Sequence, residues 1–192
     1  MTQKVLIDHI RKYLSISDEE ISEIVPFFDS HSFKKKETLL FAEKRCDRLY
    51  FVSKGCLQLY FIDDLGNQKT TQFALEGWWL TDFLAFQNHA PSNFYIETIE
   101  PSKLYSLSFS KYQALLEEHP KMEKYFRIIY QTAYGASLMR LKFNNSLSKE
   151  EIFFMFRANF PDFVQRVPQY LLASFLGLTP EYLSEIKRKK FS

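Results

Sequence analysis

The feature that most constrains the fold is an alternation of apolar and polar residues that persists between residues 33 and 107. In CLQLYFI (56–62), Leu57, Leu59 and Phe61 occupy every second position, which is the period of a β-strand. Turn-forming runs such as DDLGN and NHAPSN separate several short segments of this kind. Regularly spaced short strands predict an antiparallel roll or barrel. The expected strands are ETLLF (37–41), RLYFV (48–52), CLQLYFI (56–62), KTTQFAL (69–75), FYIETI (94–99) and KLYSL (103–107).

Helical patterns flank this block on both sides. The first 28 residues predict two short helices, the second opened by a capping box from Ser17 to Glu20. A further helix is expected to begin at Ser110 and to stop before Pro120. Residues 121–144 contain no proline, which predicts a helix of roughly 36 Å at about 1.5 Å per residue.

An apolar stripe along residues 121–144 predicts a homodimer. A helix this long cannot be wholly covered by a small roll, so a second copy is the simplest partner for its free side. The expected interface residues are Phe126, Ile129, Ala133, Ala136 and Met139. A second capping box, from Ser148 to Glu151, opens the next helix.

The C-terminal segment predicts two short helices joined by a glycine turn. The first covers Val167–Leu176 with Pro168 at a permitted first position, and Gly177 ends it. Thr179 caps the second helix, and Pro180 begins it. Tyr182, Leu183 and Ile186 are expected to supply its apolar contacts. Such a pair of helices, with basic residues at the end of the second, is typical of a helix-turn-helix, whose second helix enters the DNA major groove.

Positive charge is concentrated in the same region. Residues 166–192 hold five Lys or Arg and two Asp or Glu, giving +3, so the preceding 165 residues sum to −1 within a net charge of +2. Cations there would neutralise phosphates and release counterions. A solvated basic hairpin without a nucleic-acid partner is the alternative.

Other function classes find little support in the sequence. No apolar run is long enough to span a bilayer, and charges within the N-terminal apolar pattern argue against a signal peptide, so we expect a cytoplasmic protein without a membrane partner. The two cysteines and four histidines lack metal-ligand spacing, and no nucleophile–base pattern is evident, so we expect neither a metal site nor an enzyme. The open rivals are a cupin-like enzyme and a ligand-binding or protein-interaction module without DNA-binding activity.

On these residues, and above all on VPQYLLASFLGLTPEYLSEIKRK (167–189), the chain resembles the Crp/Fnr transcriptional regulators over nearly its whole length. The resemblance implies an α+β protein in three parts: a cyclic-nucleotide-binding-like β-roll sensor (1–120), a dimerisation helix (121–145) and a helix-turn-helix domain (146–192). It implies a homodimer that binds double-stranded DNA, with RNA polymerase and a small effector as candidate partners. The DNA-binding residues would be Arg166, Gln169, Tyr170, Thr179, Pro180, Glu181, Ser184, Glu185, Lys187 and Arg188.

The ligand-binding segment departs from relatives that bind cyclic AMP. Thr81 and Asp82 stand where those relatives have Gly-Glu, and Ser92 and Asn93 stand where they have Arg-Ser. Without the arginine, a buried phosphate lacks its charge-assisted partner, so we expect no cyclic AMP and no other known cofactor. Another effector could occupy an aromatic pocket, unless those rings simply fill the roll. The residues expected at this pocket are Trp79, Thr81, Asp82, Phe83, Ser92, Asn93 and, from the long helix, Ser137, with Trp78, Phe94 and Tyr95 as further rings.

The expected reading face of the last helix also departs from the family pattern. Pro180 and Glu185 replace positions that are often basic, while Glu181 is retained and could accept a hydrogen bond from a cytosine amino group. The preferred base sequence therefore cannot be transferred from the relatives.

Overall fold

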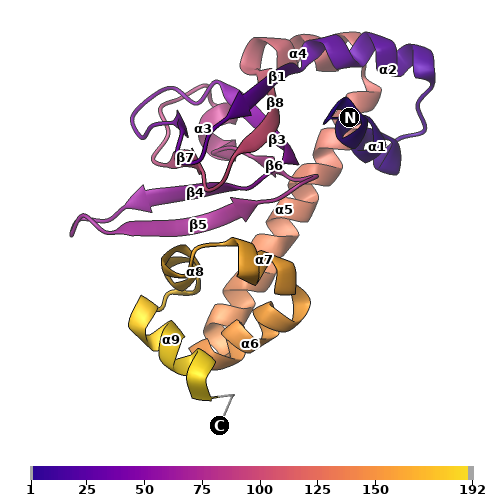
Figure 1. Cartoon of the computed structure of the whole chain (residues 1–192). Helices are drawn as coiled ribbons and strands as arrows, with labels where there is room; N and C mark the ends of the chain where they lie inside the picture. Colours follow the sequence, from indigo (N-terminus) through magenta and orange to yellow (C-terminus); the bar gives the residue numbers. More distant parts are fainter. Residues whose placement is uncertain (1, 190–192) are drawn as a thin grey trace. The chain divides into compact units, whose positions relative to one another are not determined.

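The computed structural model describes residues 2–189, so Lys190, which the charge count above includes, lies outside the described residues. Along the chain, helices and strands follow in the order shown in Figure 1. The N-terminal helices are α1 (Thr2–Tyr13), α2 (Asp18–Ile24) and the 3₁₀ helix η1 (Val25–Phe27). The strands are β1 (Asp29–Phe33), β2 (Thr38–Leu40), β3 (Arg48–Lys54), β4 (Leu57–Ile62), β5 (Gln68–Ala74), β6 (Trp79–Leu80), β7 (Tyr95–Thr98) and β8 (Ser102–Ser108), with α3 (Phe83–Gln87) between β6 and β7. The remaining helices are α4 (Phe109–Glu118), α5 (Lys121–Ser146), α6 (Lys149–Asn159), α7 (Pro161–Arg166), α8 (Gln169–Leu176) and α9 (Pro180–Lys189).

The described residues divide into two compact units. Unit 1 contains residues 2–61 and 71–131, and unit 2 contains residues 62–70 and 132–189. The first part of α5 therefore belongs to unit 1 and the rest to unit 2.

Unit 1 is built on two antiparallel sheets of four strands, as the alternating pattern predicts. One sheet has the order β1-β8-β3-β6 and the other the order β2-β7-β4-β5. In the first, Phe51 of β3 lies opposite Tyr105 of β8 and Trp79 of β6. Strands β1 and β6 and helix α3 were not predicted from the sequence.

Strand β4 is covered on both faces over its first four residues, while Phe61 and Ile62 at its end are exposed. Its first four residues are buried, including Gln58, whose amide donates to Glu97 of β7 at 3.0 Å. Tyr60 stacks on Tyr95 with 5.0 Å between ring centroids. A polar residue in an alternating pattern therefore marks a satisfied buried group here and not an exposed face.

The core of unit 1 is aromatic and extends to the helices. Trp79 Nε1 donates to the Tyr125 hydroxyl at 2.8 Å, and that hydroxyl lies 2.7 Å from His9 Nδ1. Phe126 is 2% exposed and packs edge-on against Trp79, with ring centroids 5.5 Å apart. The first turns of α5 are thus part of the core of the roll.

The N-caps of α2 and α6 agree with the sequence, whereas the N-cap of α4 differs. Ser17 and Ser148 each form the predicted capping box, with Glu20 and Glu151 respectively. Helix α4, however, begins two residues earlier than expected, because the cap that accepts from Lys111 is Ser108 and not Ser110.

Unit 2 packs helices α6 to α9 around a small apolar core. Ile152, Phe153 and Phe163 of α6 and α7 are at most 6% exposed, and so are Leu171, Leu172 and Leu176 of α8. The tip of the β4–β5 hairpin also belongs to this unit: Ser174 Oγ donates to the Gln68 carbonyl at 3.0 Å and accepts from the Thr70 amide at 2.9 Å. Helices that could cross a membrane are absent from the part of the chain that the structure describes.

Candidate functional site

Gly177 forms the turn between α8 and α9. Its backbone is left-handed (φ 68°, ψ 36°), which glycine adopts without the strain that a Cβ atom brings. The amide of Leu178 donates to the Ala173 carbonyl at 2.8 Å, and the amide of Gly177 donates to Ser174 at 3.1 Å. These bonds satisfy the last carbonyls of α8 and set the direction in which the chain leaves the helix.

The start of α9 agrees with the sequence prediction. Thr179 Oγ1 accepts from the Tyr182 amide at 3.2 Å, and Pro180 is the first helical residue. The first helix is two residues shorter than the expected Val167–Leu176, because Pro168 is its N-cap and Gln169 its first residue. Arg166 ends the separate helix α7.

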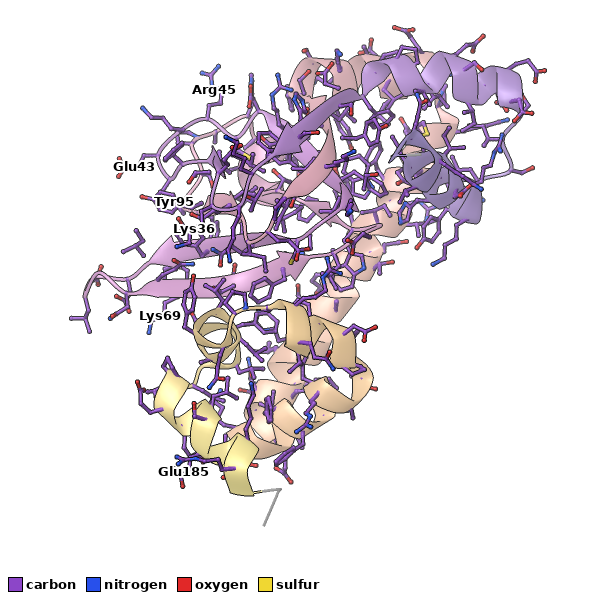
Figure 2. All side chains as sticks on the ribbon, in the orientation of Figure 1. Lys36, Glu43, Arg45, Lys69, Tyr95 and Glu185 are labelled. Atoms are coloured by element: carbon purple, nitrogen blue, oxygen red, sulfur yellow. The ribbon has the colours of Figure 1, made fainter. Side chains whose placement is uncertain are left out.

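The two long faces of α9 have opposite character. Leu183 and Ile186 are fully buried, and α8 and α9 are in contact. The exposed face carries Pro180, Glu181, Glu185 and Arg188. Glu185 lies on the outer side of the helix (Figure 2). The exposed face therefore carries charged groups of both signs.

Ser184 and Lys187 were expected to contact DNA, but both are half-buried and hydrogen-bonded to Gln169. The Gln169 amide donates to Ser184 Oγ, and Lys187 Nζ donates to Gln169 Oε1 at 3.3 Å. This network joins the first residue of α8 to the side of α9. A residue whose helical position suggests contact with DNA can thus form hydrogen bonds with the neighbouring helix instead.

Two tyrosines near the turn are more exposed than core residues. Tyr182 was expected to pack inward, yet it is 38% exposed and its hydroxyl donates to Glu150 of α6 at 3.2 Å. Tyr170 on α8 is 52% exposed.

In unit 1, the segment that was expected to line an effector pocket is joined by hydrogen bonds between its own residues. Asp82 caps α3, accepting from the Ala85 amide at 3.1 Å through Oδ1. Its Oδ2 accepts from the Ser92 hydroxyl at 2.8 Å, and Ser92 in turn accepts from the Phe94 amide at 3.0 Å. The structure thus brings Asp82 and Ser92 together, whereas Asn93 is exposed.

Thr81 extends this network inward to Cys46, which was not expected at the pocket. Its hydroxyl donates to the Arg48 carbonyl at 2.8 Å and lies 3.1 Å from Cys46 Sγ. Thr81 is 1% exposed, and burial raises the pKa of the Cys46 thiol. The thiol is therefore a buried neutral group, and no sequence spacing linked it to Thr81.

The aromatic residues that were predicted to line the pocket do not lie in one environment. Trp79 is 5% exposed in the core, whereas Trp78 is 49% exposed. Phe83 packs edge-on against Tyr130, with ring centroids 5.2 Å apart. Ser137 lies in unit 2, and its hydroxyl donates to the Ala133 carbonyl of its own helix at 3.0 Å.

The stripe predicted as the dimer interface also separates into two parts. Phe126 is buried in the roll, and Ile129 packs against the same core, so neither is free for a second chain. Ala133 is half-buried, while Ala136 and Met139 are exposed. Phe126 and Ile129 were therefore assigned incorrectly, because the period of a helix does not say which neighbour covers each turn, whereas an interface through Ala133, Ala136 and Met139 stays a prediction.

Further along α5, a different apolar stripe is exposed. Tyr134, Leu138 and Leu141 are 67%, 48% and 57% exposed. Their spacing of four and three residues places them on one face of the helix.

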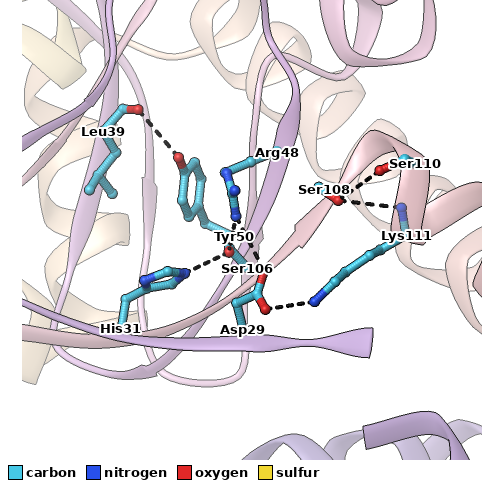
Figure 3. A network of polar contacts seen from close by, with 9 residues as sticks. All are labelled: Asp29, His31, Leu39, Arg48, Tyr50, Ser106, Ser108, Ser110 and Lys111. Atoms are coloured by element: carbon cyan, nitrogen blue, oxygen red, sulfur yellow. Dashed lines mark hydrogen bonds and ion pairs between the residues drawn. The ribbon is translucent and has the colours of Figure 1, made fainter. Parts of the chain in front are cut away.

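A Ser–His contact on the β1-β8-β3 surface does not form a catalytic triad (Figure 3). His31 Nε2 lies 2.9 Å from Ser106 Oγ, which is fully buried and also accepts from Arg48 at 2.9 Å. Asp29 binds Lys111 at 2.6 Å and Arg48 at 3.5 Å, not His31. The hydrogen bond from Lys111, followed by the one from Arg48, lowers the pKa of Asp29. This network ties strands to α4 and offers no activated nucleophile.

Within residues 2–189, no group of three or more His, Cys, Asp or Glu side chains could hold a metal ion.

Comparison with known proteins identifies the roll and the fold. Residues 30–119 match the family model of the cyclic nucleotide-binding domain. FixK2 from Bradyrhizobium japonicum has a similar structure (TM-score 0.73, 13% identity, 84% of this chain and 83% of that chain). A CooA variant from Carboxydothermus hydrogenoformans is also similar (TM-score 0.71, 12% identity, 90% of this chain and 80% of that chain). So is CLP, a c-di-GMP responsive global regulator of Xanthomonas campestris (TM-score 0.65, 14% identity, 88% of this chain and 89% of that chain). No curated protein sequence matches the chain. The resemblance predicted from the sequence is thus confirmed at the level of domain family and fold.

Proposed function

We propose that this chain, which has a cyclic nucleotide-binding domain and the fold of the Crp/Fnr regulators, is a homodimeric DNA-binding transcriptional regulator. The observation that carries the proposal is the pair α8–α9, which has the turn, caps and buried face of a helix-turn-helix. Its second helix presents Glu181, Glu185 and Arg188 outward. In the DNA complex this helix lies in the major groove, where Glu181 reads base edges and Arg188 contacts phosphate.

Dimerisation through the second half of α5 would bring two such helices to one duplex. Tyr134, Leu138 and Leu141 are large apolar side chains exposed on one helix face, which supports an interface there. A two-fold dimer requires a two-fold DNA site, with half-sites about one helical turn apart.

The roll would act without cyclic AMP. Asp82 caps α3 and accepts a hydrogen bond from Ser92, so a phosphate entering there would meet a carboxylate. No arginine stands at positions 92 or 93 to offset that repulsion. Titration of the chain with cyclic AMP in a calorimeter should give no binding heat, whereas saturable micromolar binding would refute this part of the proposal.

The test of DNA binding is selection of bound duplexes from a random-sequence pool by the full chain, with and without cell extract. The proposal predicts enrichment of sites with two-fold related halves. Enrichment that occurs only when cell extract is added would indicate that an effector is required. Failure to enrich any site under both conditions would instead favour a ligand-binding or protein-interaction module.

A further inference from the structure

A second feature of unit 2 is a cleft of about 710 Å³ between its helices. It is bordered by residues of α6, α7, α8 and α9 and by the linker between α7 and α8. Its lining residues are Arg157, Pro161, Val164, Gln165, Arg166, Val167, Pro168, Gln169 and Lys187, and within this described lining no side chain is acidic.

The cleft gathers positive charge from three helices that are separate in the sequence. Arg157 comes from α6, Arg166 from α7 and Lys187 from α9. Burial, followed by the charge of Arg157, lowers the pKa of Lys187, so these two cations are near enough to repel each other. A fold that holds like charges together in a concave site creates a positive potential that attracts an anion.

The cleft is directly linked to the proposed DNA-reading helix. Lys187 Nζ donates to Gln169 Oε1 at 3.3 Å, and the Gln169 amide binds Ser184 in the middle of α9. Both Gln169 and Lys187 line the cleft. An anion bound in it would therefore lie beside α9, next to the face that carries Glu181 and Arg188.

We propose that this basic cleft binds the sugar–phosphate backbone of duplex DNA beside the half-site that α9 reads, with Arg157 as a contact residue on α6. The inference rests on the proposed function and adds a backbone-positioning site to it. Arginine suits this role because its planar guanidinium donates two parallel hydrogen bonds to phosphate oxygens. Such contacts fix the register of the protein on DNA and do not read sequence.

The test compares charge-neutralised variants on a mixed-sequence duplex of about 40 base pairs across a range of salt concentrations. Arg166→Gln changes an exposed residue, so the variant should fold, and Arg157→Gln changes the half-buried partner on α6. Lys142→Gln is the matched control, because it removes one exposed cation of unit 2 outside the cleft. Thermal unfolding establishes that each variant is folded.

Loss of one phosphate contact per chain should reduce the log–log salt slope by about 0.9 per contact, or about 1.8 for a dimer. We expect Arg166→Gln and Arg157→Gln to show this reduction, with roughly tenfold weaker binding at low salt that is equal for all sequences. Lys142→Gln should retain the slope of the natural protein.

Three outcomes would contradict the inference in distinguishable ways. If the natural protein binds duplex and both cleft variants keep its slope, the cleft assignment is wrong while the proposed function stands. The cleft is a small-anion site if pyrophosphate binds the natural protein at micromolar concentration and binds the Arg157→Gln variant more weakly, while the salt slope of DNA binding is the same in both proteins. If the natural protein binds no duplex at all, the proposed function fails together with the cleft.

Discussion

At the scale of single residues, the turn between α8 and α9 depends on Gly177, whose left-handed backbone ends the first of the two helices. A Cβ atom at this position would strain the backbone, because φ is 68°.

Replacing Gly177 should destabilise unit 2. Gly177→Ala places a Cβ atom on a backbone with φ 68°, at a cost of about 1–2 kcal/mol in the free energy of unfolding. Gly135→Ala is the opposite control: this helical glycine has open space around it, and alanine should stabilise α5 by about 0.5–1 kcal/mol. Urea unfolding of both variants measures the difference, and equal effects would contradict the assignment of the turn.

His9 should make stability depend on pH. Trp79 donates to the Tyr125 hydroxyl, which can then donate to His9 Nδ1 only while the imidazole is neutral. Burial, with a smaller contribution from Lys12, lowers the pKa of His9 from 6.5 to about 4. The folded-state pKa lies below the unfolded value, so the stabilisation is present above pH 6.5 and is lost as pH falls towards about 4.

Urea unfolding between pH 7 and pH 4 tests this linkage. His9→Gln removes the titrating group and should flatten the decline in this range relative to the natural protein. An identical pH dependence in both proteins would show that other groups cause the loss.

The proposed reading face predicts two kinds of DNA-binding variant. Glu181→Ala should reduce discrimination between selected and scrambled duplexes, by about 1–3 kcal/mol at the base that it reads. Arg188→Ala should instead weaken all duplexes equally and reduce the salt slope by about 0.9 per contact. Fluorescence anisotropy on both duplexes separates these effects, and identical behaviour would mean that the reading face is misplaced.

At the scale of elements, a sequence pattern identifies a helix but not its neighbours. The expected helix over 121–144 is present as α5, yet Phe126 from its predicted interface is core. Similarly, the rings expected around an effector are divided between the core, as Trp79, and the surface, as Trp78. Short elements such as β6 and α3 lacked enough residues to establish a period.

The exposed stripe of α5 predicts which variant disrupts a dimer. Leu138→Glu would place a charge between Tyr134 and Leu141 and should weaken dimerisation at least 100-fold in sedimentation analysis. Met139→Glu, at a residue that is also exposed, is the matched control and should remain dimeric. The opposite pattern would show that the interface uses the Ala136 and Met139 side.

At the scale of the whole molecule, the claim is that two copies of this chain read two adjacent major grooves. The order of roll, long helix and terminal helix pair was predictable, because each part has its own hydrophobic period and punctuation. The hydrogen bond that Asp82 accepts from Ser92 could not be predicted, since it joins two residues across a loop.

The most direct test of this claim varies the spacing between half-sites in a selected duplex. A dimer with fixed reading helices should bind best with half-site centres about 10 base pairs apart, as two chains per duplex. Inserting about 5 base pairs turns one half-site to the opposite side of the helix, and affinity should fall at least 100-fold. Unchanged affinity, or a complex of one chain per duplex, would contradict the account.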